Sequence, residues 1–344
     1  MPMTCLAIQL EGAFHVGNLV LRELPLGELA PHHVRVAIRA ASLNFRDLLM
    51  VRGVYNPKQP TPLIPCSDGA GEVLAVGANV RAFKVGDRVA TCFFQDFCSG
   101  EATREKMSTS LGGPIQGTLR TVCDFLETGL VHTPSYLTDG EAATLPCAAL
   151  TAWNALVEQG NVKPGQTILL QGTGGVSIAA LQIARELLGA QVILLSRSAE
   201  KLRLASAYRL LGAIDTGATP DWSKAARALT PGGRGVDHVV DVGGADTLQQ
   251  SIRALRPGGT VSVIGVLSGA KTELQLTPML MQNLRLQGVL VGTREMQLRM
   301  NAAYTSAAIK PIISQQFSLA EARQAFAALA LGAHFGKVVI RVDA

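Results

Sequence analysis

The sequence is poor in aromatic residues, in clustered charge and in long apolar runs. Phe, Trp and Tyr make up 5% of its 344 residues. No apolar run reaches the roughly 18 residues that a membrane-spanning helix needs, and the N-terminus lacks the regions of a signal peptide. Lys and Arg are scattered without a dense tract, at a net charge of +5. We therefore expect a cytoplasmic protein that binds neither nucleic acid nor membranes.

Cysteines are few, and their spacing indicates no metal cluster. None stands in a C-x-x-C pattern, and the one close pair, Cys92 and Cys98, does not match a standard zinc spacing. We expect most of the thiols to be free and buried. The six cysteines are Cys5, Cys66, Cys92, Cys98, Cys123 and Cys147.

Apolar residues and glycines are plentiful, and their pattern changes along the chain. With 48% hydrophobic residues, the chain has enough apolar material for about two domains. Residues 1–125 alternate short strand-like runs with Gly and Pro turns, which predicts a compact, partly open β barrel. The tail, residues 292–344, holds a helical pattern and a final strand over 337–341. We expect that strand to return to the first domain.

Residues 126–291 alternate helical stretches with apolar strands, which is typical of a doubly wound parallel sheet. The fold class predicted for the chain is therefore α/β, with a doubly wound sheet next to the barrel. The expected strands of the sheet are residues 167–171, 192–196, 213–215, 236–242, 260–265 and 286–291.

A glycine-rich turn between the first of these strands and a helix predicts dinucleotide binding. Glycines let the backbone approach a pyrophosphate closely, and the N–H groups at the start of the helix face its charge. The third glycine position of G-x-G-x-x-G holds Ser177, and a tight turn without a ligand is the alternative interpretation. The residues expected to contact the cofactor here are Gly172, Thr173, Gly174, Gly175 and Val176.

The end of the second strand of the sheet bears on the choice of cofactor. Sheets that prefer NAD place an acid there to hold the ribose diol. This chain has Ser196 and Arg197 there, followed by Lys201, and these side chains suit a 2′-phosphate. We favour NADP(H) over NAD(H); the alternative is that both cations are ordinary solvated residues at a helix start.

Several stretches in order along the whole chain resemble the medium-chain dehydrogenase/reductase superfamily. They are similar above all to its zinc-free quinone oxidoreductase-like branch. The resemblance implies a GroES-like barrel domain, a Rossmann domain and a nicotinamide-dependent oxidoreductase. The matching stretches are residues 42–47, 64–73, 84–89, 142–153, the glycine turn and 235–244.

The resemblance also bears on metal binding. Zinc-dependent members carry Cys, His and Cys ligands and leave one position open. The first position corresponds to Asn44 and the second to Ser67, while Cys147 alone keeps a thiol. One thiolate cannot hold a catalytic zinc ion, so we expect no metal, and we expect Cys147 to be packed in the core or to line the active site.

Further cofactor contacts are implied by the resemblance alone. They lie near the nicotinamide ribose, at strand ends and in the returning tail. Turns and core packing are the alternative roles of these residues. The implied residues are Thr151, Gly243, Gly265, Val266, Val291, Gly292, Thr293, Phe335 and Lys337.

Three residues are candidates for the chemistry. Asn44 can donate a hydrogen bond to the substrate or fix the nicotinamide, and Asp47 pins its loop by capping or by pairing with Arg46. Tyr55 either walls the pocket, which we favour, or donates a proton, and water is another proton source. Without a Lewis acid, a quinone or an enone is easier to reduce than a simple carbonyl.

These considerations predict an NADPH-dependent, zinc-independent reductase of quinones or α,β-unsaturated carbonyls. A zinc-free alcohol dehydrogenase or aldehyde reductase is one alternative. Another is a cofactor-binding redox sensor without turnover, because a fold does not determine a function. The resemblance also implies a homodimer that pairs through the edge strand at residues 286–291.

Overall fold

The computed structural model describes residues 3–342. The chain divides into two compact units. Unit 1 comprises Met1–Leu150 and Val291–Ala344, and unit 2 comprises Thr151–Leu290. Together they are the GroES-like domain and the parallel-sheet Rossmann domain expected from the sequence.

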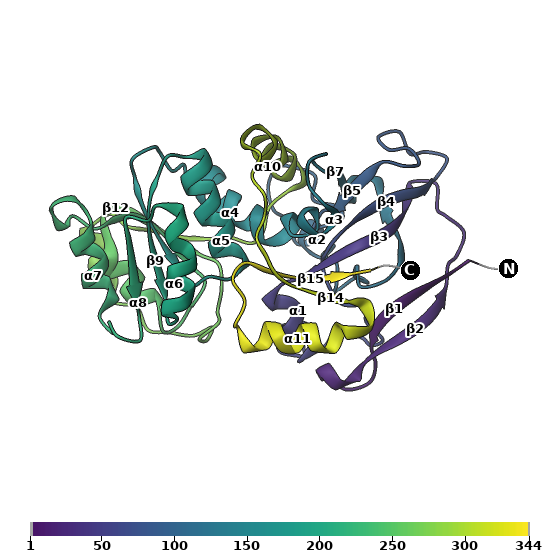
Figure 1. The fold of residues 1–344 in the computed structure, drawn as a ribbon, viewed down its shortest axis with the longest axis horizontal. Helices are drawn as coiled ribbons and strands as arrows, with labels where there is room; N and C mark the ends of the chain where they lie inside the picture. Colours follow the sequence, from purple (N-terminus) through teal and green to yellow (C-terminus); the bar gives the residue numbers. More distant parts are fainter. Residues whose placement is uncertain (1–2, 343–344) are drawn as a thin grey trace. The chain divides into compact units, whose positions relative to one another are not determined.

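Unit 1 is built on a seven-stranded sheet with the strand order β14-β15-β3-β4-β5-β7, in which β6 also pairs with β3. A separate hairpin joins β1 and β2. The helices α1 and α11 pack against each other (Figure 1). The strands of unit 1 are β1 (Thr4–Leu10), β2 (Leu19–Pro25), β3 (His33–Leu43), β4 (Asp68–Val76), β5 (Arg88–Thr91), β6 (Val122–Leu126), β7 (Leu130–His132), β14 (Ile313–Ser318) and β15 (Lys337–Arg341). Its helices are α1 (Phe45–Val51), α2 (Arg104–Met107), α3 (Asp139–Ala142), α10 (Arg294–Ala307) and α11 (Ala322–Leu331).

The expected return of the last strand to the first domain is confirmed. Strand β15 pairs antiparallel with β3, with Val338 opposite Leu43 (Figure 1). Residues 126–150, which the sequence pattern assigned to the Rossmann part, lie in unit 1. The reason is a pairing that no local pattern reveals: the short strand β7 adds to β5, and α3 packs on β3 and β4.

Unit 2 is a six-stranded parallel sheet with helices between its strands (Figure 1). Apolar side chains from the strands and from α7 and α8 form its core. The strands are β8 (Thr167–Gln171), β9 (Gln191–Ser196), β10 (Gly212–Asp215), β11 (Val236–Asp241), β12 (Leu255–Val263) and β13 (Arg285–Gly288). The helices are α4 (Leu150–Trp153), which begins one residue before the unit, α5 (Gly175–Gln182), α6 (Ala199–Ala205), α7 (Trp222–Leu229), α8 (Leu248–Ala254) and α9 (Leu276–Met281).

The strand order of unit 2 is β10-β9-β8-β11-β12-β13. This is the order 3-2-1-4-5-6 of dinucleotide-binding sheets, in which the strand order reverses between β8 and β11 while all strands stay parallel. Ligands bind such sheets beyond the carboxyl ends of the strands at that point. The glycine turn after β8 and the residues after β11 therefore lie at the expected place. Among residues 3–342, no helix is long and apolar enough to cross a membrane.

Candidate active site

Asn44 lies where β3 ends and α1 begins, so its position is set by both elements. The Asp47 carboxylate accepts a hydrogen bond from the Asn44 backbone N–H at 2.8 Å, and this contact caps the helix. Asp47 also forms an ion pair with Arg46 at 3.3 Å. Both contacts are those of an acid that pins the loop. Burial raises the pKa of Asp47 to about 6, against the lowering effect of Arg46.

The Arg46 guanidinium is buried and tied to several parts of unit 1. It donates to the carbonyl oxygens of Leu111 and Gly113, both at 2.8 Å. It also lies 5.2 Å from the ring centre of Tyr55 and 5.0 Å from that of Phe93. The Tyr55 side chain is exposed, so its ring covers the guanidinium from the outside. The wall and proton-donor roles of Tyr55 both stay predictions.

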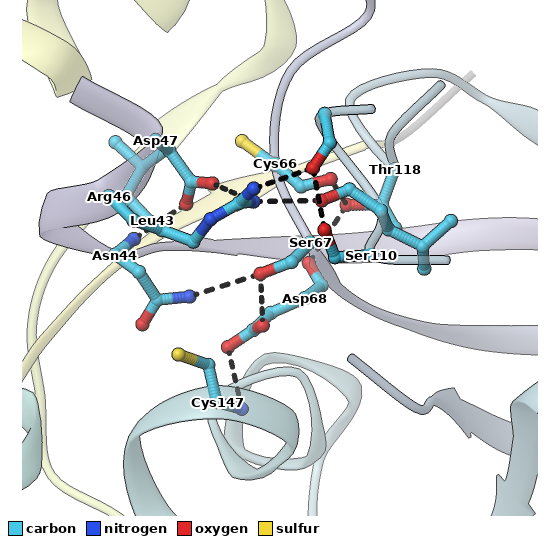
Figure 2. A network of polar contacts seen from close by, with 12 residues as sticks. Leu43, Asn44, Arg46, Asp47, Cys66, Ser67, Asp68, Ser110, Thr118 and Cys147 are labelled. Atoms are coloured by element: carbon cyan, nitrogen blue, oxygen red, sulfur yellow. Dashed lines mark hydrogen bonds and ion pairs between the residues drawn. The ribbon is translucent and has the colours of Figure 1, made fainter. Parts of the chain in front are cut away.

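Asp68 begins β4, Ser67 directly precedes it, and both are fully buried. The Ser67 hydroxyl donates to the Asp68 carboxylate at 2.7 Å and accepts from Nδ2 of Asn44 at 3.5 Å. Burial raises the pKa of Asp68, although the charge of Lys337 and bonds from Asn44 and Ser67 lower it. Figure 2 shows Asn44, Ser67 and Asp68 in a row, with Cys147 directed toward them from its helix.

Lys337 completes this group from the start of β15. Its ammonium donates to Oδ1 of Asn44 at 2.5 Å and to the Leu43 carbonyl at 2.7 Å. It lies 4.0 Å from the Asp68 carboxylate. We call Asn44, Ser67, Asp68 and Lys337 the Asn44 network. Lys337 is also one of the residues expected to contact the cofactor, which stays a prediction; within the chain its ammonium contacts Asn44, Leu43 and Asp68.

The glycine turn of unit 2 leaves open space beside its backbone, between the end of β8 and the start of α5. Gly172 has a φ of +71°, and no atom lies within 4 Å of the place where a Cβ would stand. Gly174 caps α5, and Ser177 donates to the Gln171 carbonyl at 2.6 Å. Ser177, which replaces the third glycine, therefore ties the helix start to the strand. The turn fits the phosphates of a dinucleotide.

A buried carboxylate that was not among the predicted site residues, that of Asp241, joins this turn to the turn after β11. Asp241, at the end of β11, accepts from the backbone N–H groups of Gly243 and Gly244 at 3.0 Å. It also accepts from Gln171 at 3.0 Å and from Ser251 at 2.6 Å. A charged residue that ends an apolar strand was the available signal, because a buried carboxylate must find donors.

The residues expected around a 2′-phosphate lie together at the end of β9. Ser196 is buried, and its hydroxyl accepts from the Ser198 backbone N–H at 3.1 Å. Arg197 is exposed, and Lys201 is in the first turn of α6. Desolvation and the nearby charge of Arg197 lower the pKa of Lys201. Two cations held close together suit a doubly charged anion.

The remaining expected cofactor residues divide between the units. In unit 2, Thr151 is buried in α4, Gly243 follows β11, and Gly265 and Val266 follow β12. In unit 1, Val291 has a φ of +50°, which is unusual for a β-branched residue. The other unit 1 residues are Gly292, which is buried, Thr293, which caps α10, and Phe335, whose N–H donates to Ser314.

Comparison with known proteins decides the family. A zinc-type alcohol dehydrogenase-like protein of Schizosaccharomyces pombe is 38% identical over 92% of this chain and 92% of its own length. The chain belongs to the medium-chain dehydrogenase/reductase superfamily. Family models agree: the alcohol dehydrogenase GroES-like domain matches residues 30–135, and zinc-binding dehydrogenase matches residues 175–305. The protein is therefore an oxidoreductase of this superfamily, whose members use a nicotinamide cofactor.

Two further similarities cover nearly the whole chain. The crystal structure of a putative alcohol dehydrogenase from Sinorhizobium meliloti has a TM-score of 0.92 and 37% identity, and covers 99% of this chain and 100% of that one. An acryloyl-coenzyme A reductase of Sulfurisphaera tokodaii is 26% identical over 93% of this chain and 96% of its own length. The superfamily fold thus accompanies differently named activities.

The zinc in these family names can be tested against the residues present. At the positions of the catalytic ligands, this superfamily member has the Asn44 amide, the Ser67 hydroxyl and the Cys147 thiol. The Asn44 oxygen accepts from an ammonium, and burial raises the pKa of the Cys147 thiol, which disfavours the thiolate that zinc requires. Among residues 3–342, no three His, Cys, Asp or Glu side chains are grouped to hold a metal ion. This donor set does not fit zinc.

All six cysteines are free thiols. Cys147 and Cys98 are half-buried, and the other four are buried. The backbone N–H of Cys147 donates to the Asp68 carboxylate at 3.3 Å, which places this residue against the Asn44 network. The expectation of mostly buried, free thiols is confirmed.

Proposed function

We propose that this protein is an NADPH-dependent, zinc-independent reductase of quinones or α,β-unsaturated carbonyls. The observation that carries the proposal is the Asn44 network. Where zinc-dependent relatives place metal ligands, the chain has hydrogen-bond donors held by an ammonium and a buried carboxylate. Such a site offers hydrogen bonds to a developing negative charge but no Lewis acid.

The class of substrate follows from this chemistry. A simple carbonyl that receives a hydride builds a full negative charge on one oxygen, for which a metal is a strong partner. In an enone or a quinone, conjugation spreads the charge, so a neutral donor such as Asn44 suffices. The relative named acryloyl-coenzyme A reductase supports a conjugated substrate, since acryloyl groups contain a C=C bond next to a carbonyl.

The residues that would hold NADPH lie mostly in unit 2. The glycine turn at Gly172 and Gly174 would receive the pyrophosphate, and Arg197 and Lys201 the 2′-phosphate. The further residues proposed to line the cofactor are Thr151, Thr173, Gly175, Val176, Ser196, Gly243, Gly265, Val266, Val291, Gly292, Thr293 and Phe335. The bound cofactor would supply a hydride; the protein's part is to orient it and to stabilise charge.

A homodimer is part of the proposal. Strand β13 forms one edge of the unit 2 sheet, with no neighbour on its outer side among the described strands. The preceding helix α9 exposes Leu276, Leu280 and Met281, each at 70% or more of its surface. A second copy that pairs through β13 would cover the edge and these side chains. Light scattering at several protein concentrations tests this, and a monomer throughout would contradict it.

The test of the proposed function is NADPH consumption by metal-stripped protein. Quinones, enones and simple aldehydes are compared side by side, with NADH as the control cofactor. We expect turnover with quinones or enones and a preference for NADPH. Aldehyde turnover restored by added zinc would overturn the proposal. Aldehyde turnover without zinc would indicate a zinc-free aldehyde reductase instead. No NADPH consumption with any substrate would favour a cofactor-binding sensor.

A further inference from the structure

We infer that Lys337 is a positioning residue that fixes the Asn44 carboxamide in one orientation and thereby makes its N–H group the donor to the substrate oxygen. This inference rests on the proposed function and names the groups that stabilise its charge. It removes Lys337 from the cofactor contacts and places it behind Asn44.

The position of Lys337 is set by the pairing of two strands that are distant in the sequence. It is the first residue of β15, and the next residue, Val338, pairs with Leu43 of β3. The side chain is 6% exposed, so its ammonium must find partners within the protein. It finds them in the Leu43 carbonyl at 2.7 Å and in Oδ1 of Asn44 at 2.5 Å.

The orientation of the Asn44 amide follows from the chemistry of its neighbours. An ammonium can only donate, so the amide atom that faces Lys337 must be the oxygen. The NH2 group then lies on the other side, toward Ser67. Because the Ser67 hydroxyl gives its hydrogen to the Asp68 carboxylate, it accepts from Asn44. The hydrogen bonds of the Asn44 network therefore run in one direction. Lys337 donates to Asn44, Asn44 to Ser67, and Ser67 to Asp68.

The two ends of the Asn44 amide are held with different strength. Its oxygen has a short, charge-assisted bond to Lys337, whereas Nδ2 has a bond of 3.5 Å to Ser67, at the outer limit of hydrogen-bond geometry. The nitrogen faces the Ser67 hydroxyl and the Asp68 carboxylate, and it carries two N–H groups, so a substrate oxygen can accept from one of them while the other keeps its contact. The ammonium also draws electron density from the amide, which makes the N–H a better donor. Asn44 is 8% exposed.

The proposed step balances as follows for an enone. A bound NADPH would supply the hydride for a new C–H bond at the β carbon; the C=C electron pair would shift toward the carbonyl, and the carbonyl π pair would move to its oxygen. The Asn44 N–H stabilises this enolate oxygen, and a proton from water then completes the α carbon. NADPH is oxidised to NADP⁺ and the substrate is reduced. Lys337 contacts none of the reacting atoms.

The experiment is a double-mutant cycle with Asn44→Ala, Lys337→Met and the combined variant, with Lys84→Met as the control at an exposed lysine. We expect kcat to fall by about 100-fold in each single variant, with the Kd of NADPH within about threefold of wild type. The combined variant should be no slower than Asn44→Ala alone. Lys337 acts only by orienting the Asn44 N–H, so its loss has no effect once that N–H is absent. Lys337→Arg should recover part of the activity. Additive losses in the cycle would overturn the inference.

The variant Asn44→Asp distinguishes the loss of the N–H donor from the loss of side-chain volume. It keeps the size of the side chain and an oxygen for Lys337 but has no N–H group, so we expect it to lose turnover. Because the new carboxylate lies beside the buried Asp68, we expect lower stability than wild type, and urea unfolding checks that the variant is folded under the assay conditions. Wild-type turnover in this variant would overturn the inference. Should wild type reduce another substrate instead of quinones or enones, the proposed function fails, and the same cycle on that substrate decides the role of Lys337.

An NMR measurement tests the role of Lys337 even if the wild-type protein turns over none of the substrates. In ¹⁵N-labelled protein, the side-chain amide signals of Asn44 are identified by their absence in Asn44→Asp. We expect these signals to move in Lys337→Met and to stay in Lys84→Met. Unchanged signals in Lys337→Met would show that the ammonium does not orient the amide, whatever the substrate.

Discussion

The Asp241 carboxylate accepts a 3.0 Å hydrogen bond from Nε2 of Gln171, and so links the ends of β11 and β8. The same carboxylate holds the backbone N–H groups of Gly243 and Gly244. Both turns at the switch point of the unit 2 sheet thus depend on one buried charge.

We predict that Asp241→Asn lowers the free energy of unfolding by about 2–3 kcal/mol, because the new NH2 group faces donors instead of accepting from them. The Kd of NADPH should rise as well, since the glycine turn loses its anchor. Urea unfolding and a fluorescence titration with NADPH measure the two effects. Asp246→Asn, at an exposed position in the same loop, serves as the control. Unaltered stability and affinity would contradict the linking role.

The cations after β9 give a prediction about cofactor choice. The double variant Arg197→Ala/Lys201→Ala should raise the KM for NADPH by about 10–100-fold and leave the KM for NADH nearly unchanged. The reason is that NADH has no 2′-phosphate for these groups to bind. Arg203→Ala, on the exposed side of α6, is the matched control. An equal rise of the KM for NADPH and for NADH would show that Arg197 and Lys201 do not bind the 2′-phosphate.

Substitutions of Tyr55 distinguish its two predicted roles, a wall of the pocket and a proton donor. We expect Tyr55→Phe to keep kcat/KM within about threefold of wild type, because the ring and its stacking on Arg46 remain. Tyr55→Ala should lower it further, since the guanidinium loses its cover. If the hydroxyl donated the proton, Tyr55→Phe would instead lose about 100-fold or more, most of it in kcat.

His238 predicts how stability depends on pH. It is buried in β11 with its Nε2 2.9 Å from the Ser262 hydroxyl, and desolvation, with the charge of Arg285, lowers its pKa to about 4. The unfolded chain has a His pKa near 6.5 and therefore binds the proton more tightly. The stability from a neutral His238 is complete above about pH 6.5 and declines as the pH falls toward 4, by up to about 3 kcal/mol.

The variant His238→Gln should flatten this decline, because Gln carries no charge in either state. Urea unfolding at pH 7, 6 and 5 measures the slope, with His32→Gln at an exposed position as control. The same slope in His238→Gln and wild type would assign the decline to other groups.

Local sequence patterns predicted much of unit 2. The apolar run before Gly172 and the helical spacing after it are short-range features, and β8 and α5 follow them. The predicted strands differ from the observed ones mainly at their ends: β12 begins at Leu255 rather than near residue 260, and β13 ends at Gly288 rather than near 291. Strand ends depend on neighbouring strands, so sequence periodicity defines them poorly.

The residue types alone specify which chemical groups are available: an amide and a hydroxyl instead of zinc ligands, a glycine turn, and cations instead of an acid after the second strand of the Rossmann sheet. Which of these groups meet depends on how distant strands pair. Lys337 reaches Asn44 across 293 positions of the chain because β15 pairs with β3, and Asp241 reaches Gln171 because β11 pairs with β8. Such contacts depend on the register of long-range strand pairing, which the packing of the whole sheet selects and no local pattern encodes.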